Sequence, residues 1–77
     1  MENYRCKRHR RSAPGRSDGP VIDELTFPAA SAAEAENKVR RLLTLRLHPM
    51  DWEKDFVTLE DDAGHILVTW LHGILHA

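Results

Sequence analysis

Cysteine is almost absent from this 77-residue chain, which holds Cys6 alone. One thiol cannot form an intramolecular disulfide, and a low cysteine content is typical of proteins in a reducing compartment. Long apolar runs are absent as well, because the longest one, Ile66 to Leu71, is interrupted by Thr69 and falls far short of the roughly 20 residues of a membrane-spanning helix. The basic N-terminal stretch lacks the apolar segment of a secretory signal. These absences predict a cytoplasmic protein without a membrane segment.

Sequence patterns that carry catalysis are scarce too. The chain shows no carboxylate pair, glycine-rich phosphate loop or serine elbow. A chain of this length buries only about 60% of its unfolded surface, which leaves little volume for an enclosed active site. Cys6 is the one candidate nucleophile, with a thiolate stabilised by Arg5 and Lys7 and with His9 as a base, but a small buried cysteine in a strand explains the same residues. We expect no enzymatic activity and no cofactor.

What the chain does contain is an ordinary globular composition, with 42% hydrophobic and 30% charged residues. We expect one small domain spanning residues 1–77. The net charge of −1 conceals an uneven distribution, because residues 1–17 carry six basic groups and one acid, and residues 18–77 carry eleven acids and five basic groups. Such asymmetry favours either a basic arm for polyanions or two surfaces that attract each other within the molecule or across a dimer.

The basic start of the chain predicts a strand followed by a loop. Residues 4–8 alternate Tyr4 and Cys6 with basic side chains, which is the period of a half-buried strand. Residues 12–20, SAPGRSDGP, are rich in Ser, Pro and Gly and predict a mobile loop.

Residues 21–27, VIDELTF, predict a second strand. Val21, Leu25 and Phe27 occupy one face of it, and Asp23 is an exception on this apolar side.

A capping box marks the start of a helix. The Ser31 hydroxyl can accept a hydrogen bond from the Glu34 amide, and the Glu34 side chain can reach back to the Ser31 amide. The apolar face of this helix comprises Ala32, Ala35, Val39, Leu42 and Leu43. Pro49 disfavours helical dihedrals at the residue before it, so the helix ends before His48.

Two further β-rich runs, residues 56–60 and 65–71, flank the sequence Asp61-Asp62-Ala63-Gly64. This spacing predicts a hairpin with a type I turn, in which Gly64 supplies the left-handed residue of a bulge.

The register of this hairpin stays open at the level of the sequence. In one register, Val57 and Leu59 share a face with three residues of the last strand, which are Ile66, Val68 and Trp70. In another register Phe56 joins that face instead.

The order strand, strand, helix, strand, strand predicts an α+β fold, ββαββ, in which a single antiparallel sheet carries one helix on one face. Four features stand out along it: Tyr4 at the opening of the first strand, Asp23-Glu24 before an apolar position, the helix start from Ala29 to Glu36, and the closing hairpin DDAGHILVTW. In these features the chain resembles a family of short uncharacterised bacterial proteins, a domain of unknown function with a ββαββ pattern. The resemblance implies the fold and no particular activity.

Five basic residues are candidates for binding a polyanion: Arg5, Lys7, Arg8, Arg10 and Arg11. Lysine and arginine release counterions from a nucleic-acid backbone, and Tyr4 or His9 can stack on a base. The alternative is a solvated edge strand whose charges discourage aggregation between sheets. Because the rest of the chain is acidic and contains no nucleic-acid recognition motif, nucleic acid is the second choice of partner.

Two pairs of residues have spacings that zinc tolerates, Cys6-x-x-His9 and His72-x-x-x-His76. The stretch between the pairs is much longer than in a compact zinc finger, and a strand alternates the faces of Cys6 and His9. The run Glu60-Asp61-Asp62 lacks the alternating oxygen ligands and the terminal glutamate of a calcium site, and it is typical of a turn. We therefore expect no metal site.

The C-terminal segment WLHGILHA offers a candidate partner interface comprising Trp70, Leu71, Ile74 and Leu75. Exposed aromatic and aliphatic clusters mark interfaces, and we favour a homodimer, whose stability would depend on pH if His72 and His76 lie in the interface. The alternative is a tail, residues 72–77, clamped on the core of its own domain. The sequence as a whole predicts a non-enzymatic protein that binds another protein or a second copy of itself, with nucleic-acid binding as the alternative.

Overall fold

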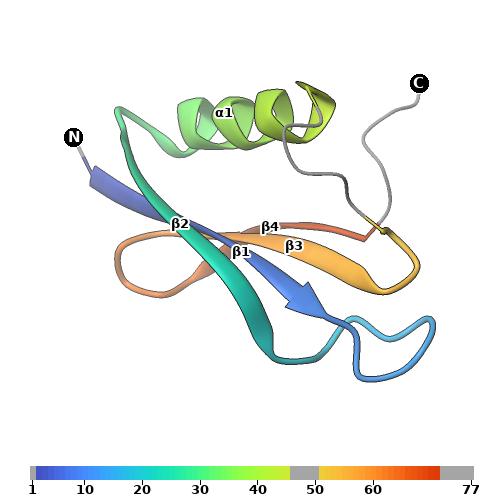
Figure 1. The fold of residues 1–77 in the computed structure, drawn as a ribbon. Helices are drawn as coiled ribbons and strands as arrows, with labels where there is room; N and C mark the ends of the chain where they lie inside the picture. The colour runs from blue at the N-terminus through green and yellow to red at the C-terminus, as the bar shows by residue number, and fades with distance from the viewer. Residues whose placement is uncertain (1, 46–50, 72–77) are drawn as a thin grey trace.

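The computed structural model describes residues 2–45 and 51–71. Within them the chain forms β1 (Glu2–Arg10), β2 (Val21–Ala29), α1 (Ala32–Leu45), β3 (Asp55–Glu60) and β4 (Ile66–Trp70). The strands make one antiparallel sheet in the order β2-β1-β3-β4, and α1 lies across one face of it (Figure 1). The predicted α+β class and ββαββ order are confirmed.

The basic segment forms an interior strand. β1 has nine residues, more than the predicted span of residues 4–8, and it pairs with β2 on one side and with β3 on the other. Cys6 lies opposite Leu25 of β2 and opposite Leu59 of β3. The alternative that this segment is a charged edge strand is therefore wrong, because the edges of the sheet are β2 and β4.

The start of α1 has one of the two hydrogen bonds of the predicted capping box. The Glu34 amide donates a hydrogen bond to the Ser31 hydroxyl at 3.2 Å. One turn further on, the Lys38 ammonium lies 3.5 Å from the Glu34 carboxylate, an exposed i to i+4 pair that contributes only a few tenths of a kcal/mol. The cap therefore fixes where the helix begins, and packing against the sheet supplies most of its stability.

The core lies between α1 and the face of the sheet that carries Tyr4 and Cys6, which we call the helix face. The apolar residues buried there are Tyr4, Ala29, Ala35, Val39, Val57 and Leu59. Half-buried side chains pack around them, namely Cys6, Phe27, Leu43, Trp52, Val68 and Trp70. Ala32 is exposed, so the prediction that it belongs to the apolar face of the helix is wrong; the helix meets the sheet only from Ala35 onward.

β2 departs from the predicted pattern at its start. The register passes from Asp23 opposite Arg8 to Val21 opposite His9, so Ile22 is the extra residue of a β-bulge. Val21 therefore lies on the side of the sheet away from α1. The prediction that Val21 shares a face with the other apolar residues of β2 is wrong, because the bulge shifts the alternation by one residue.

The predicted hairpin between β3 and β4 is confirmed. The Gly64 amide donates to the Asp61 carbonyl at 3.1 Å, and the Asp61 amide donates to the His65 carbonyl at 3.0 Å. Gly64 has a φ of +89°, in the left-handed region that favours glycine.

The structure also decides the hairpin register. Leu59 lies opposite Val68 on the helix face. A shift between Leu59 and Glu60 then places Ile66 opposite Glu60, on the face away from α1, where Ile66 is 62% exposed. The expectation that Ile66 joins Val68 on the core side is wrong, because Leu67 is the extra residue of a second bulge.

The connection between β1 and β2, residues 11–20, is a loop closed by hydrogen bonds. The Ser12 amide donates to the Asp18 carbonyl at 2.9 Å, and the Ser12 hydroxyl donates to the Asp18 carboxylate at 2.8 Å. Gly19 has a φ of +152°, and a Cβ at this position would lie 1.8 Å from the carbonyl oxygen of Arg10. The loop therefore needs glycine at position 19 for both its dihedral angle and its close approach to β1.

We expect Gly19→Ala to lower the free energy of unfolding by roughly 3 kcal/mol or more, because the added methyl group collides with backbone. Gly15→Ala is the matched control: φ is +81° there but no atom lies within 4 Å of the added Cβ, so only the dihedral strain of about 1 kcal/mol applies. Urea denaturation followed by circular dichroism measures both losses. Equal losses would contradict the close approach at Gly19.

Candidate protein-binding surface

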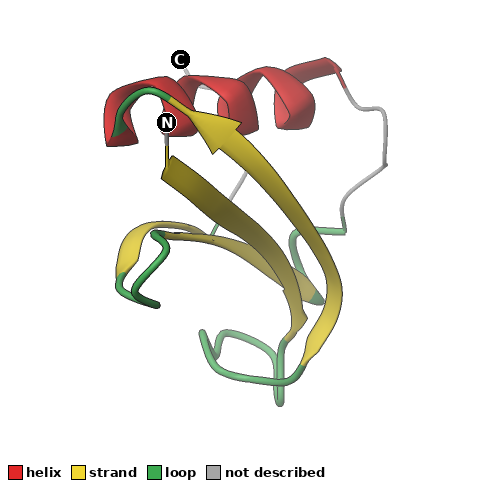
Figure 2. Cartoon of the chain, turned by 90° about the vertical axis from the view of Figure 1, so that its left-hand side faces the viewer, coloured by secondary structure: helices red, strands yellow, loops and turns green. Residues whose placement is uncertain are grey.

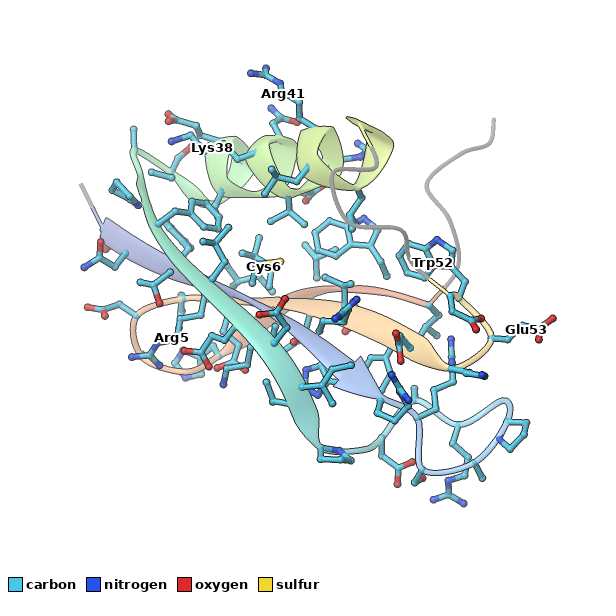
Figure 3. The ribbon with its side chains drawn as sticks, viewed as in Figure 1. Arg5, Cys6, Lys38, Arg41, Trp52 and Glu53 are labelled. Atoms are coloured by element: carbon cyan, nitrogen blue, oxygen red, sulfur yellow. The ribbon has the colours of Figure 1, made fainter. Side chains whose placement is uncertain are left out.

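The predicted polyanion-binding residues are divided between the two faces of the sheet. Side chains alternate along β1, so Arg8 and Arg10 share the helix face with Cys6, and Arg5 and Lys7 lie on the opposite face, which we call the open face. Figure 3 shows Cys6 in the layer between α1 and the sheet, and Arg5 on the far side of the sheet. The five cations therefore do not form one surface.

Two of these cations neutralise buried carboxylates of β3. The Lys7 ammonium lies 2.9 Å from the Glu60 carboxylate, and the Arg10 Nε donates to the Asp55 carboxylate at 2.7 Å. Glu60 is 8% and Asp55 is 3% exposed. Because a buried carboxylate without a partner is costly, Lys7 and Arg10 are committed to the pairing of β1 with β3.

Arg11 joins three segments through their backbone carbonyls. Its Nη2 donates to Leu71 at 2.6 Å and to Trp52 at 3.3 Å, and its Nη1 donates to Arg16. The guanidinium carbon also lies 5.7 Å from the centre of the Phe56 ring. These contacts make Arg11 a structural residue that ties the β1–β2 loop to the start of β3 and the end of β4.

Arg5 and Arg8 are the members of the five for which the described part of the chain provides neither an ion pair nor a side-chain hydrogen bond, whereas Arg11 has no ion pair but binds carbonyls. They point to opposite faces. A nucleic-acid backbone is bound by several neighbouring cations at once, so two arginines on opposite faces make a poor polyanion site.

Cys6 and His9 also point to opposite faces. On the open face, His9 Nδ1 donates to the Gly19 carbonyl at 3.2 Å, which leaves Nε2 to accept the Thr58 hydroxyl at 2.8 Å. The imidazole stacks on the Phe56 ring with 4.6 Å between centres. His9 is therefore neither a base for Cys6 nor its partner in a zinc site.

The Cys6 thiol lies in an environment that disfavours the thiolate. Burial, with a smaller contribution from the charge of Asp23, raises the pKa of this thiol to about 11. Arg5 and Lys7, the expected stabilisers of a thiolate, project from the other face. Cys6 therefore packs as a small core residue.

The acidic run at the end of β3 has the roles of a turn. The Asp61 carboxylate accepts hydrogen bonds from the amides of His65 at 2.8 Å and of Ala63 at 3.0 Å, and the bond from His65 is the main cause that lowers the Asp61 pKa below its usual range. Among residues 2–45 and 51–71 no three His, Cys, Asp or Glu side chains gather at a possible metal position. His72 and His76 lie outside the described residues.

The predicted C-terminal interface is described only in part. Trp70 is half-buried and packs against the core, and Leu71 is half-buried with its carbonyl held by Arg11. Ile74 and Leu75 lie outside the described residues.

The exposed apolar side chains lie instead at the two edges of the sheet. On β2 they are Val21, Ile22 and Leu25, which are 44%, 42% and 48% exposed, and on β4 they are Ile66 and Leu67, at 62% and 39%. Sequence reasoning missed the β2 surface, because the alternation turns Leu25 toward α1 correctly but does not show that β2 is an edge. The available sequence signal was the apolar content of residues 21–27, and a strand in the interior of the sheet would show the same pattern.

A groove lies between β2 and the C-terminal half of α1. The helix begins beside the end of β2 and the two elements then diverge (Figures 1 and 2). The groove has a volume of about 290 Å³ and is lined by Cys6, Arg8, Asp23, Glu24, Leu25, Leu42, Leu43 and Val57. Most of these side chains are apolar, and the charged ones are contributed by β1 and β2. The groove and the edge of β2 therefore form one continuous surface, which we call the β2 surface.

Comparisons with protein-family models, with curated proteins and with solved structures find no match for this chain. The resemblance to a domain-of-unknown-function family therefore stays a prediction. Over the described residues, α1 is too short and too polar to cross a membrane.

We expect Arg10→Gln to lower the free energy of unfolding by about 1–3 kcal/mol, because it removes the cation that faces the buried Asp55. Arg16→Gln is the control, since it breaks a pair with Asp18 in which the side chains are 62% and 60% exposed, and a much smaller loss is expected because solvent screens the pair. Urea denaturation measures both. A small loss for Arg10→Gln would mean that this arginine is free for other contacts.

We expect native Cys6 to react with iodoacetamide at pH 8 at least about 100-fold more slowly than in the urea-unfolded chain, whose thiol pKa is near 8.5. The reason is that a pKa raised by burial keeps the thiol protonated, so the rate should keep rising up to pH 10. Mass spectrometry of the alkylated protein gives the rates. Fast alkylation at pH 7 would restore Cys6 as a candidate nucleophile.

Proposed function

We propose that this chain is a non-enzymatic protein-binding module that contacts its partner through the β2 surface. The observation that carries the proposal is an edge strand of nine residues on which Val21, Ile22 and Leu25 are 44%, 42% and 48% exposed. A free strand edge can receive a further strand, whose backbone hydrogen bonds supply affinity while side-chain pockets supply specificity. Exposed apolar surface of this kind is common at protein interfaces.

The groove supports this proposal because it lies where an added strand would direct its side chains. Alternate side chains of a strand beside β2 would point to the helix face, next to Leu25 and toward Leu42 and Leu43 of the groove. Apolar side chains of a partner would then be buried against these leucines.

The other edge is a weaker candidate. β4 has five residues, and its exposed Ile66 and Leu67 adjoin a bulge. A short and bulged edge offers few aligned backbone groups to a partner, which is a common protection against strand addition.

Nucleic-acid binding, the alternative function, has less support, because Lys7 and Arg10 pair with carboxylates and Arg11 binds carbonyls. We infer the cytoplasm as the location, supported by the single cysteine, which is free. The absence of catalysis is supported by the raised pKa of Cys6 and by the separation of Cys6 from His9.

Selection of random peptides from a phage-display library tests the proposal. We expect peptides that bind the wild-type protein to lose at least about 10-fold in affinity for Leu25→Lys, because the charge removes apolar contact at the centre of β2. Ile66→Lys is the matched control, since Ile66 is 62% exposed on the other edge, and it should leave affinity unchanged. Circular dichroism verifies the fold of both variants. Peptides that bind Leu25→Lys as well as wild type would refute the β2 surface as the contact, as would a selection that yields no binder.

A further inference from the structure

We propose that the occupant of the β2 surface is a second copy of this chain, paired with the first about a two-fold axis at Leu25. The inference rests on the proposed function and names the partner of the same surface. Antiparallel pairing of β2 with its symmetry mate would join the two four-stranded sheets into one continuous sheet.

The first argument comes from the direction of backbone groups in the sheet. The Arg10 amide donates to the Pro20 carbonyl at 2.9 Å, and the Arg11 amide donates to the Lys54 carbonyl at 2.6 Å. Since neighbouring residues of a strand point their amides and carbonyls to opposite sides, even-numbered residues of β1 bond to β2 and odd-numbered ones bond to β3.

The register between β1 and β2 shows which backbone groups of β2 point to β1 and which point outward. Leu25 lies opposite Cys6, so its amide and carbonyl point to β1, and those of Glu24 and Thr26 point away from the sheet. Pro28 points the same way, but it has no N–H and its carbonyl accepts the Lys38 ammonium at 2.9 Å. Between the bulge and the end of β2, Glu24 and Thr26 are therefore the residues whose amide and carbonyl both point outward. The Glu24 amide donates locally to the Asp23 carboxylate at 3.0 Å, and pairing with a new strand would replace this bond.

A two-fold axis at Leu25 uses both of these residues. It sets Glu24 opposite Thr26 of the second copy, and the symmetric pair forms on the other side of the axis, so each pair exchanges two hydrogen bonds. An axis at Asp23 or at Glu24 would place identical carboxylates opposite each other. An axis at Thr26 would set Glu24 opposite Pro28, which has no N–H to donate. Charge and backbone chemistry therefore favour one register.

The same register brings opposite charges together on the helix face. Asp23 lies opposite Phe27 of the second copy. Within each chain the Lys38 ammonium lies 5.9 Å from the centre of the Phe27 ring, so the ammonium of the second copy approaches Asp23. By symmetry this contact occurs twice. Figure 3 shows Lys38 on α1, on the part of the helix nearer the end of β2.

Pairing at Leu25 also covers part of the exposed apolar surface. The two copies of Leu25, each 48% exposed in the single chain, face each other at the axis. Phe27 of the second copy lies beside Asp23, at the rim of the groove. Because α1 begins at the Ala29 end of β2, the two helices would begin at opposite ends of the paired strands.

Disulfide trapping tests the register in a Cys6→Ala background that removes the native thiol. Leu25→Cys should form a disulfide-linked dimer on mild oxidation, because a non-hydrogen-bonded pair at the axis has Cα atoms about 4.5 Å apart, within the range of a disulfide. Glu24→Cys and Thr26→Cys are the controls, since each lies one residue from the axis and its symmetry mate is too far away for a disulfide. Circular dichroism verifies the fold. Trapping at Glu24 or Thr26 in place of Leu25 would overturn the register.

A charge exchange tests the contact of Asp23 with Lys38. Asp23→Lys and Lys38→Asp should each raise the dimer dissociation constant by about 10-fold, and the double variant should recover most of the wild-type value, because the exchanged charges again face each other. Sedimentation equilibrium measures the constants, and thermal melts detect any loss of the fold. Additive weakening in the double variant would contradict this contact.

Sedimentation of the wild-type chain decides whether the occupant is a second copy. A monomer at every concentration up to the millimolar range would overturn this inference. In that case the proposed function stands if selected peptides still lose affinity for Leu25→Lys, and the partner is then a different protein. The proposed function is wrong if the peptides bind Leu25→Lys as tightly as wild type, whatever the oligomeric state.

Discussion

The pairing of β1 with β3 is the interaction on which the rest of the fold depends. β3 follows the helix in the sequence, and it enters the sheet beside the N-terminal strand, where all six of its residues are buried. The two strands are held by Lys7 with Glu60 at one end and by Arg10 with Asp55 at the other. Without this contact, the β1–β2 and β3–β4 hairpins would separate, and α1 would lose the layer against which it packs.

This pairing also explains the uneven charge of the chain. The basic N-terminal residues and the acidic remainder are far apart in the sequence, but the register brings cations of β1 next to carboxylates of β3. Opposite charges therefore meet within one molecule at these two ion pairs. Two other cations of the segment have no carboxylate partner among the described residues. Arg11 binds backbone carbonyls. Arg8 lines the groove, and its Nε is buried without a hydrogen-bond partner among the described residues.

With β1 and β3 inside the sheet, the surface left for a partner is set by the edges. Both edge strands contain a bulge, but β4 has five residues, whereas β2 has nine and diverges from α1, which opens the groove beside it. Asp23, Glu24 and Pro28 are residues that usually protect an edge strand from uncontrolled pairing. On β2 they also discriminate between registers, because each disfavours a different alignment of two copies. In the dimer that we propose, the same three residues would both limit uncontrolled pairing and select one register.

The sequence by itself determined the elements and their order. The Ser31 cap, the alternation of Tyr4 and Cys6, and the Asp61 to Gly64 turn act through neighbouring residues, so they are readable from the chain. The tertiary structure alone decided which strands are edges and where the bulges at Ile22 and Leu67 fall. Leu25 is exposed because β2 is an edge, and the cations of β1 are divided between the two faces of the sheet. Local patterns fix the conformation of a segment. The neighbours of a strand are chosen by contacts between residues distant in the sequence, which no local pattern records.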